Sequence, residues 1–331
     1  MIPRDTAKIT GGALNPAIKK LVTNVRKVIV GKDSVIRLAL ACLFARGHLL
    51  IEDVPGIGKT MLARAISRSL AVKFRRIQFT PDLLPSDVTG VSVFHPSRQT
   101  FEFHEGPVFT NVLLSDEINR ASPRTQSSLL ECMEELQVTV DGTTHHLEHP
   151  FFVVATQNPV ELDGTYPLPE AQLDRFLMRI EVGYPEIDQE MKILDDQRIS
   201  HPIEDLDPVL GLQDLTKIQN AVRGLHVSEE IRRYIVSLVD ATRDNSDIRL
   251  GISPRGGLAL MRASQALSFL DGHSFVTPDA VKAVAPAVLS HRMILNPHRE
   301  HTGLNKATVV RAILADVPVP TLPHEKLASQ G

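Results

Sequence analysis

The fold of this chain is decided by the stretch Leu49-Leu50-Ile51-Glu52-Asp53-Val54-Pro55-Gly56-Ile57-Gly58-Lys59-Thr60, which the helical run from Met61 to Leu70 follows. The stretch joins an apolar strand to a loop with glycines, and the loop opens into the helix. Because Gly56 and Gly58 have no Cβ, successive backbone N–H groups can turn inward around a phosphate, and the helix N-terminus adds partial positive charge. The stretch therefore predicts a loop that binds a triphosphate.

Two side chains at the end of this loop carry the predicted chemistry. Lys59 is expected to reach the β- and γ-phosphates, and the Thr60 hydroxyl is expected to ligate Mg²⁺. The strict pattern has glycine where this chain has Asp53, and the alternative is a glycine turn with a solvated lysine. The preceding strand and the following helix favour the phosphate loop. The residues expected to hold the nucleotide here are Pro55, Gly56, Ile57, Gly58, Lys59, Thr60 and Met61.

A second apolar strand, Val112-Leu113-Leu114-Ser115-Asp116, ends in two adjacent carboxylates, those of Asp116 and Glu117. Burial of two carboxylates is costly unless a cation or a reacting water uses them. Asp116 is therefore predicted to belong to the Mg²⁺ shell, and Glu117 to polarise the water that attacks the γ-phosphate. The alternative is a strand that runs into a solvated acidic loop, which is less favoured once a phosphate loop precedes it.

The composition of the 331 residues is that of an ordinary soluble globular protein, with 43% apolar and 23% charged residues. The formal charge of −3 argues against a dedicated binder of polyanions. Cys42 and Cys132 form neither a disulfide framework nor a metal motif, so a reducing cytoplasm is the simplest setting. No apolar stretch approaches the length of a bilayer span, and Met1 to Gly12 contain no apolar signal core. We therefore expect a cytoplasmic protein without a transmembrane segment.

Five short apolar runs punctuate the first part of the chain, and helical patterns lie between most of them. This alternation predicts a mostly parallel sheet with helices on both faces and with ligands at the carboxyl ends of the strands. Both motifs described above lie at such ends. The runs are His48–Glu52, Phe74–Phe79, Asn111–Ser115, Phe151–Ala155 and Phe176–Val182.

Two predicted β-hairpins interrupt the alternation. Val91–Phe94 and Thr100–Phe103 form the first, and Gln137–Val140 pairs with the residues after Asp141-Gly142 in the second. We expect no strand after Tyr184-Pro185. The later patterns are helical, with Ser253 and Thr277 as N-caps before proline. The expected helices are Ile187–Arg198, Leu215–Leu225, Ser228–Arg243, Pro254–Leu270 and Pro278–Leu289.

These patterns divide the chain into four parts. Residues 1–14 are expected to form a flexible tail, after which Asn15 caps a helix with Pro16 at its first position. Residues 15–186 are expected to form an α/β nucleotide-binding domain with two hairpin insertions, and residues 187–316 a helical lid domain. Residues 317–331, with their repeated prolines, are expected to be an extended tail.

Further motifs make the chain resemble an AAA+ ATPase: Ala155-Thr156-Gln157-Asn158-Pro159 closes the fourth run, and Leu173-Asp174-Arg175-Phe176 precedes the fifth. Within this class the chain is most similar to the MoxR family. That resemblance extends from about Val28 to about Arg292. It implies a P-loop AAA+ core, an α/β fold with a parallel five-stranded sheet flanked by helices, plus a small all-α lid domain. Three stretches carry it: Gly47-His48-Leu49-Leu50-Ile51-Glu52-Asp53-Val54-Pro55-Gly56, Asp116-Glu117-Ile118-Asn119-Arg120-Ala121, and Gly164-Thr165-Tyr166-Pro167-Leu168-Pro169-Glu170-Ala171-Gln172-Leu173-Asp174-Arg175-Phe176.

The resemblance also implies roles for individual residues. Asn158 would be the first sensor, which helps to hold the attacking water, and Arg175 would be the arginine finger for a neighbouring subunit. Arg255 would be the second sensor, for its own nucleotide or for a neighbour's. The Val30-Gly31 region would lie near adenine. Without the resemblance, Asn158 would be a turn-former before proline, and Arg175 a surface residue in a salt bridge.

The resemblance implies a homo-hexameric ring that hydrolyses ATP with Mg²⁺ and remodels other proteins, often with a partner that has a von Willebrand factor A domain. A nucleic-acid motor is one alternative, because relatives with a hairpin in the same place translocate on DNA. The acidic balance of the chain and the lack of a basic stripe weigh against it. A scaffold that binds ATP but hardly hydrolyses it is the other alternative, and Glu117 counts against it.

Two other groups of residues have simpler interpretations. His145, His146 and His149 have a spacing that suggests a metal, but no cysteine or second carboxylate pattern completes a site, so a solvated or pore-facing hairpin is favoured. The pair Glu134-Glu135 follows a helical run and is interpreted as a solvated helix face.

Overall fold

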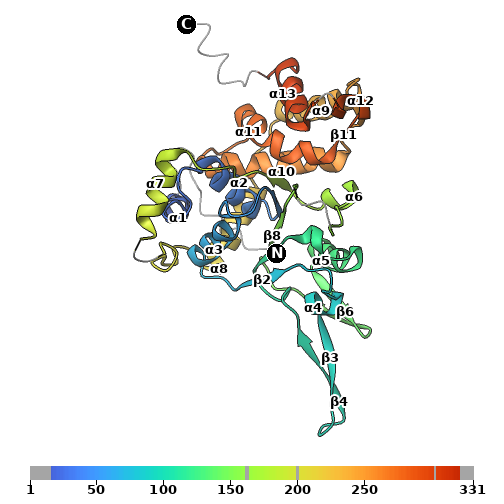
Figure 1. Ribbon diagram of the computed structural model, residues 1–331. Helices are drawn as coiled ribbons and strands as arrows, with labels where there is room; N and C mark the ends of the chain where they lie inside the picture. Colours follow the sequence, from blue (N-terminus) through green and yellow to red (C-terminus); the bar gives the residue numbers. More distant parts are fainter. Residues whose placement is uncertain (1–15, 161–163, 199–200, 302, 321–331) are drawn as a thin grey trace, which may run out of the picture.

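The computed structural model describes residues 16–160, 164–198, 201–301 and 303–320 (Figure 1). Helix α1 (Pro16–Arg26) begins at Pro16, as predicted. The predicted tail of residues 1–14 and the predicted cap at Asn15 lie outside the described residues, as do residues 321–331 of the predicted C-terminal tail.

The five apolar runs form one sheet, which confirms the predicted fold class. Its strands follow the order β2-β5-β8-β1-β9, and every neighbouring pair is parallel. The carboxyl ends of these strands therefore lie along one edge, where ligands bind in sheets of this kind. The strands are β1 (Leu49–Glu52), β2 (Phe74–Gln78), β5 (Val112–Asp116), β8 (Phe152–Gln157) and β9 (Met178–Ile180).

The alternation of side chains along β5 shows why both faces of the sheet are covered. Val112 and Leu114 belong to one buried apolar cluster, whereas Leu113 belongs to another on the opposite face. Buried parallel strands of this kind require helices on both sides. The flanking helices are α2 (Asp33–Phe44), α3 (Lys59–Ser69), α4 (Pro85–Thr89), α5 (Pro123–Glu135) and the short α6 (Glu170–Leu173), with the 3₁₀ turn η1 (Ile118–Arg120) after β5.

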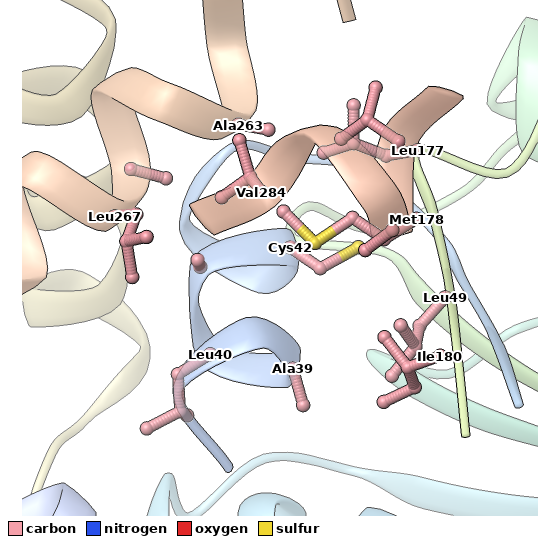
Figure 2. Packing of buried hydrophobic residues seen from close by; sticks show 14 of the residues in the cluster. Ala39, Leu40, Cys42, Leu49, Leu177, Met178, Ile180, Ala263, Leu267 and Val284 are labelled. Carbon is pink, nitrogen blue, oxygen red and sulfur yellow. The ribbon is translucent and has the colours of Figure 1, made fainter. Parts of the chain in front are cut away.

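The helices of the second half of the chain pack against α2 and against the edge strand β9 of the sheet. Figure 2 shows Cys42 of α2 beside Met178 of β9, with Ala263 and Val284 of the later helices in the same cluster. One continuous apolar core thus joins the two halves. The later helices are α7 (Ile187–Asp196), α8 (Leu212–Arg223), α9 (Glu229–Arg243), α10 (Pro254–Leu270), α11 (Pro278–Leu289), α12 (Pro297–His301) and α13 (Lys306–Asp316), with the 3₁₀ turn η2 (Ser290–Arg292) after α11.

Both predicted hairpins are present. Strands β3 (Gly90–His95) and β4 (Thr100–Glu105) form the first, which extends away from the body of the molecule in Figure 1. Strands β6 (Gln137–Val140) and β7 (Thr143–His146) form the second.

The prediction that no strand follows Pro185 was wrong. Strands β10 (Ile248–Leu250) and β11 (Ile294–Leu295) pair antiparallel between the later helices. Segments of two and three residues are too short to show the alternation by which a strand is recognised in a sequence. Helix α7 also ends at Asp196, two residues before the predicted Arg198, and α8 begins at Leu212 rather than Leu215.

Candidate active site

The loop after β1 has the backbone that its sequence predicts. Gly56 has φ +85° and Gly58 has φ +93°, in the left-handed region that favours glycine. Gly58 immediately precedes α3, so Lys59 and Thr60 lie in the first turn of this helix. The N-terminal N–H groups of that turn are available to a phosphate.

Asp53, which departs from the strict pattern, ties the loop to the chain after β9. Its Oδ2 accepts hydrogen bonds from the amides of Val182 (2.8 Å) and Gly183 (2.7 Å), and its Oδ1 accepts one from the amide of Val54 (2.8 Å). The backbone oxygen of Asp53 also accepts a hydrogen bond from Lys59 Nζ at 2.6 Å. The carboxylate at this position therefore fixes the base of the loop.

Asp116 is a buried carboxylate at the end of β5. Its Oδ1 accepts a hydrogen bond from Thr156 Oγ1 at 2.6 Å, and its Oδ2 pairs with Arg76 Nη2 at 2.7 Å. Carboxylate and hydroxyl oxygens such as those of Asp116 and Thr60 are the ligands that Mg²⁺ prefers, so the residues at this edge fit the predicted metal. Sequence reasoning did not identify Thr156 or Arg76, although both lie on strands next to β5.

Glu117 follows β5 in the left-handed backbone region, with φ +55°. Its Oε2 accepts hydrogen bonds from Gln78 Nε2 at 2.7 Å and from Arg120 Nη1 at 3.0 Å. Its amide donates to Thr156 Oγ1 at 2.9 Å. The unusual backbone and these contacts hold the carboxylate at the carboxyl edge of the sheet.

Lys59 lies close enough to these carboxylates to interact with them. Burial lowers the pKa of the Lys59 ammonium, while the negative charges of Asp116, Asp53 and Glu117 oppose that shift. The phosphate loop and the two predicted strand-end carboxylates are therefore brought together.

Asn158 lies just after β8 at the same edge of the sheet and is largely buried. Its Oδ1 accepts a hydrogen bond from the amide of Val160 at 3.1 Å. This is the local contact expected of a turn-former, and it leaves the amide nitrogen of the side chain for another partner.

A cavity of about 290 Å³, here called the phosphate-loop cavity, joins the loop to the predicted adenine region. Gly56, Ile57, Gly58 and Met61 line it together with Val30. Neighbouring Gly31 has φ +72°, and a Cβ there would clash with the side chain of Gln189. The phosphate-loop cavity is also lined by Val28, Ile29, Val182, Gly183, Ile193 and Gln197.

The two predicted arginines lie elsewhere, in a second cavity of about 340 Å³ that we call the arginine cavity. Arg175 precedes β9, whereas the phosphate loop follows β1, and these two strands are parallel neighbours. The arginines and the phosphate loop therefore lie at opposite edges of the sheet. The structure does not bring Arg175 or Arg255 to the Lys59 of the same chain.

Glu134 holds both arginines. Its Oε2 lies 3.1 Å from Arg175 Nη2, and its Oε1 lies 3.2 Å from Arg255 Nη2. Arg255 Nε also pairs with Asp174 Oδ2 at 3.3 Å. Glu134 is exposed, as predicted for a helix face, but no local sequence pattern indicated its two partners.

A third arginine, Arg292, fixes the segment that carries Arg175. Its side chain is 4% exposed, and its Nε pairs with Asp174 Oδ1 at 2.8 Å. Its Nη2 donates to the backbone oxygen of Phe176 at 2.7 Å. Sequence reasoning did not identify this residue, because its partners lie more than a hundred positions away in the chain.

The histidine-rich hairpin packs against an aromatic ring of the first hairpin. His145 stacks on Phe103 with 3.9 Å between ring centroids. Within the part of the chain that the structure describes, no group of three or more His, Cys, Asp or Glu side chains is arranged to hold a metal ion. The same part contains no helix that is both long enough and apolar enough to cross a membrane.

Comparison with known proteins identifies the class. A family model described as "ATPase family associated with various cellular activities (AAA)" matches residues 48–178, and an "AAA lid domain" model matches residues 240–313. A solved structure described as a "putative ATPase" from Cytophaga hutchinsonii superposes with a TM-score of 0.86 at 38% identity, covering 92% of this chain and 95% of that one. The fold is that of an AAA ATPase, which binds and hydrolyses ATP.

Two relatives indicate the family to which the chain belongs within the AAA ATPases. The Bacillus subtilis protein YeaC is 50% identical over 93% of this chain and 96% of its own length. Chaperone MoxR1 of Mycobacterium tuberculosis is 37% identical over 92% of this chain and 82% of its own length. The chain belongs to the MoxR family of AAA+ ATPases.

Proposed function

We propose that this ATPase works as a subunit of a ring, in which each active site is built from two copies of the chain. The observation that carries this proposal is the separation of Lys59 and Arg175 to opposite edges of one sheet. A residue at the amino edge of the strands cannot act on a nucleotide at the carboxyl edge of the same sheet. Head-to-tail association would bring the two edges of different copies together, and such contacts close into rings.

Within one site, the copy that binds ATP supplies the phosphate loop. The Lys59 ammonium would contact the phosphates, and the Thr60 hydroxyl and the Asp116 carboxylate would hold Mg²⁺. Bound Mg²⁺ would neutralise charge on the β- and γ-phosphates. The Glu117 carboxylate accepts a proton from the attacking water, and Asn158 orients that water.

The neighbouring copy supplies Arg175 and Arg255. Both arginines pair with Glu134 in one cavity. We therefore propose that both face the γ-phosphate bound by the neighbouring copy. Arg255 would then act on the neighbour's nucleotide rather than on the nucleotide of its own chain. Positive charge at this position stabilises the negative charge of the transition state.

The work coupled to hydrolysis is proposed to be the remodelling of other proteins. The name of the relative Chaperone MoxR1 supports a chaperone role for this chain as well. A hexameric ring, a cytoplasmic location and a partner with a von Willebrand factor A domain are proposed on the family resemblance alone.

The proposal is tested by measuring the ATPase rate per subunit as the protein is diluted, with sedimentation in parallel. Because one chain cannot complete a site, the rate per subunit should fall as assemblies dissociate into monomers. A rate per subunit that stays constant in samples shown to be monomeric would contradict the shared site.

A further inference from the structure

The outer face of α7 is apolar and uncovered. Ile187, Met191 and Leu194 are 78%, 59% and 70% exposed. Their spacing of four and three residues places them in one stripe along the helix. An exposed apolar stripe of this kind, with polar residues beside it, is typical of a protein interface.

The residues on either side of this stripe are acidic. Asp188 and Asp195 flank it on one side and Glu190 on the other, by their positions around the helix. None of these three carboxylates takes part in an ion pair with a described residue, whereas Lys192 is paired with Asp196 at 2.9 Å. The face of α7 is therefore an apolar centre with a negative rim.

A surface of opposite character lies beside the arginine cavity. Arg46 and Arg262 line both this cavity and an adjoining one of about 250 Å³, which Arg223 also lines. In the described ranges no carboxylate pairs with any of the three, and Arg46 donates instead to Asn220 Oδ1 at 2.8 Å. Leu258, 51% exposed, lies among them on the wall of the arginine cavity. We call Arg46, Arg223, Leu258 and Arg262 the arginine-lined face.

The two surfaces are placed as a head-to-tail contact requires. Helix α7 lines the phosphate-loop cavity through Ile193, and Gln197 just after the helix lines it too, so α7 lies beside the nucleotide site. The arginine-lined face borders Arg175 and Arg255. In Figure 1, α7 and α6, which precedes Arg175, lie on opposite sides of the molecule. A neighbour that brings Arg175 to the phosphate loop thus brings its arginine-lined face towards α7.

We propose that α7 of one copy docks on the arginine-lined face of the next copy. The inference rests on the proposed ring and names the contact that builds it. The apolar stripe packs on Leu258, and Asp188, Glu190 and Asp195 face the unpaired guanidinium groups. Complementary charge around an apolar centre orients partners and increases their rate of association.

The first test is the double variant Met191→Lys with Leu194→Lys. Both side chains are exposed, so the fold should persist, but two ammonium groups would face the arginines of the neighbour. Affinity of the isolated subunit for ATP should stay at the wild-type value. Assembly and ATPase activity at equal protein concentration should fall by about tenfold or more, as expected when central interface residues are lost. The matched control is Val236→Lys on α9, where an apolar side chain is 64% exposed and no change is expected.

The second test locates the contact. Copies with Leu194→Cys and copies with Arg262→Cys, distinguished by size tags, are mixed with ATP and oxidised. The native thiols of Cys42 and Cys132 are buried and should not react. Disulfide dimers should join one Leu194→Cys copy to one Arg262→Cys copy. Val236→Cys in place of Leu194→Cys should give none.

The outcomes separate this inference from the proposed ring. If the double lysine variant assembles and hydrolyses ATP like the wild type, the proposed ring is retained but the α7 contact is wrong. The apolar stripe would then bind another partner. Disulfides between two Leu194→Cys copies would overturn it too, because they would show a symmetric contact. If the wild type itself hydrolyses ATP as a monomer, both the proposed ring and this inference are wrong.

Discussion

Single side chains set the electrostatics of the phosphate site. Glu117 is oriented by Gln78, Arg120 and Thr156 before any substrate arrives, and the backbone at Glu117 is in a region that L-residues seldom adopt. Strained, oriented carboxylates of this kind are common where a water is activated. The contacts support the role proposed for Glu117 in hydrolysis.

Glu117→Gln should bind ATP but fail to hydrolyse it. The amide keeps the shape of the side chain, but it cannot accept a proton from water as a carboxylate does. Hydrolysis should fall by about 10²-fold or more, the usual contribution of a general base. ATP retained on the protein and phosphate release are measured side by side, with Glu135→Gln as the exposed control. Hydrolysis within about tenfold of wild type would show that Glu117 does not activate the water.

At the scale of elements, His48 joins three of them. It lies just before β1, its Nδ1 accepts a hydrogen bond from the amide of Val153 on β8 at 3.0 Å, and its Nε2 lies 3.1 Å from the backbone oxygen of Met133 on α5. This arrangement requires the neutral ring, with the proton on Nε2. Burial lowers the pKa of His48 from 6.5 to about 4.

Acid should therefore weaken the fold through His48. The unfolded chain binds the proton more readily than the folded chain, so the free energy of unfolding falls as the pH drops from 6.5 towards 4. Urea unfolding of the wild type and of His48→Gln at pH 7 and pH 5 measures the free energy of unfolding of each protein. The wild type should lose roughly 1–2 kcal/mol more than the variant over this interval. Equal losses would mean that His48 titrates alike in both states.

The sequence predicted elements well where local signals were strong. Helices α10 and α11 begin and end where their proline starts and apolar periodicity indicate, and each of the five sheet strands lies on a predicted run. The short β10–β11 pair has no such signal, since strands of three and two residues show no alternation. The contact of Arg292 with Asp174 joins residues 118 positions apart, and no local sequence pattern predicts such a contact.

At the site too, local patterns could not indicate contacts between residues that are far apart in the chain. The phosphate loop and the Asp116-Glu117 pair could be predicted because the chemistry fixes residue types over a short stretch. The partners that hold Glu117 and Arg175, among them Gln78 and Glu134, could not, because they come from other strands and helices.

At the scale of the whole molecule, the division of the site between two edges of the sheet determines how the protein can work. The phosphate loop lies at the carboxyl edge, and Arg175 and Arg255 lie at the other edge, where Arg292 of η2 fixes the segment that carries Arg175. In the proposed ring, a change at either edge therefore alters a site that is shared with a neighbouring copy. Hydrolysis in the proposed ring therefore requires a neighbouring copy.

The most direct test mixes two inactive variants. Lys59→Ala should lose nucleotide binding, and Arg175→Ala should bind ATP but lose about 10³-fold or more in hydrolysis, the usual effect of an arginine finger. Mixed rings contain interfaces that pair an intact Lys59 site with an intact Arg175 of the other chain. With subunit exchange verified, the ATPase rate plotted against mixing ratio should rise to a maximum above both variants. A flat line at the sum of their residual rates would contradict the shared site.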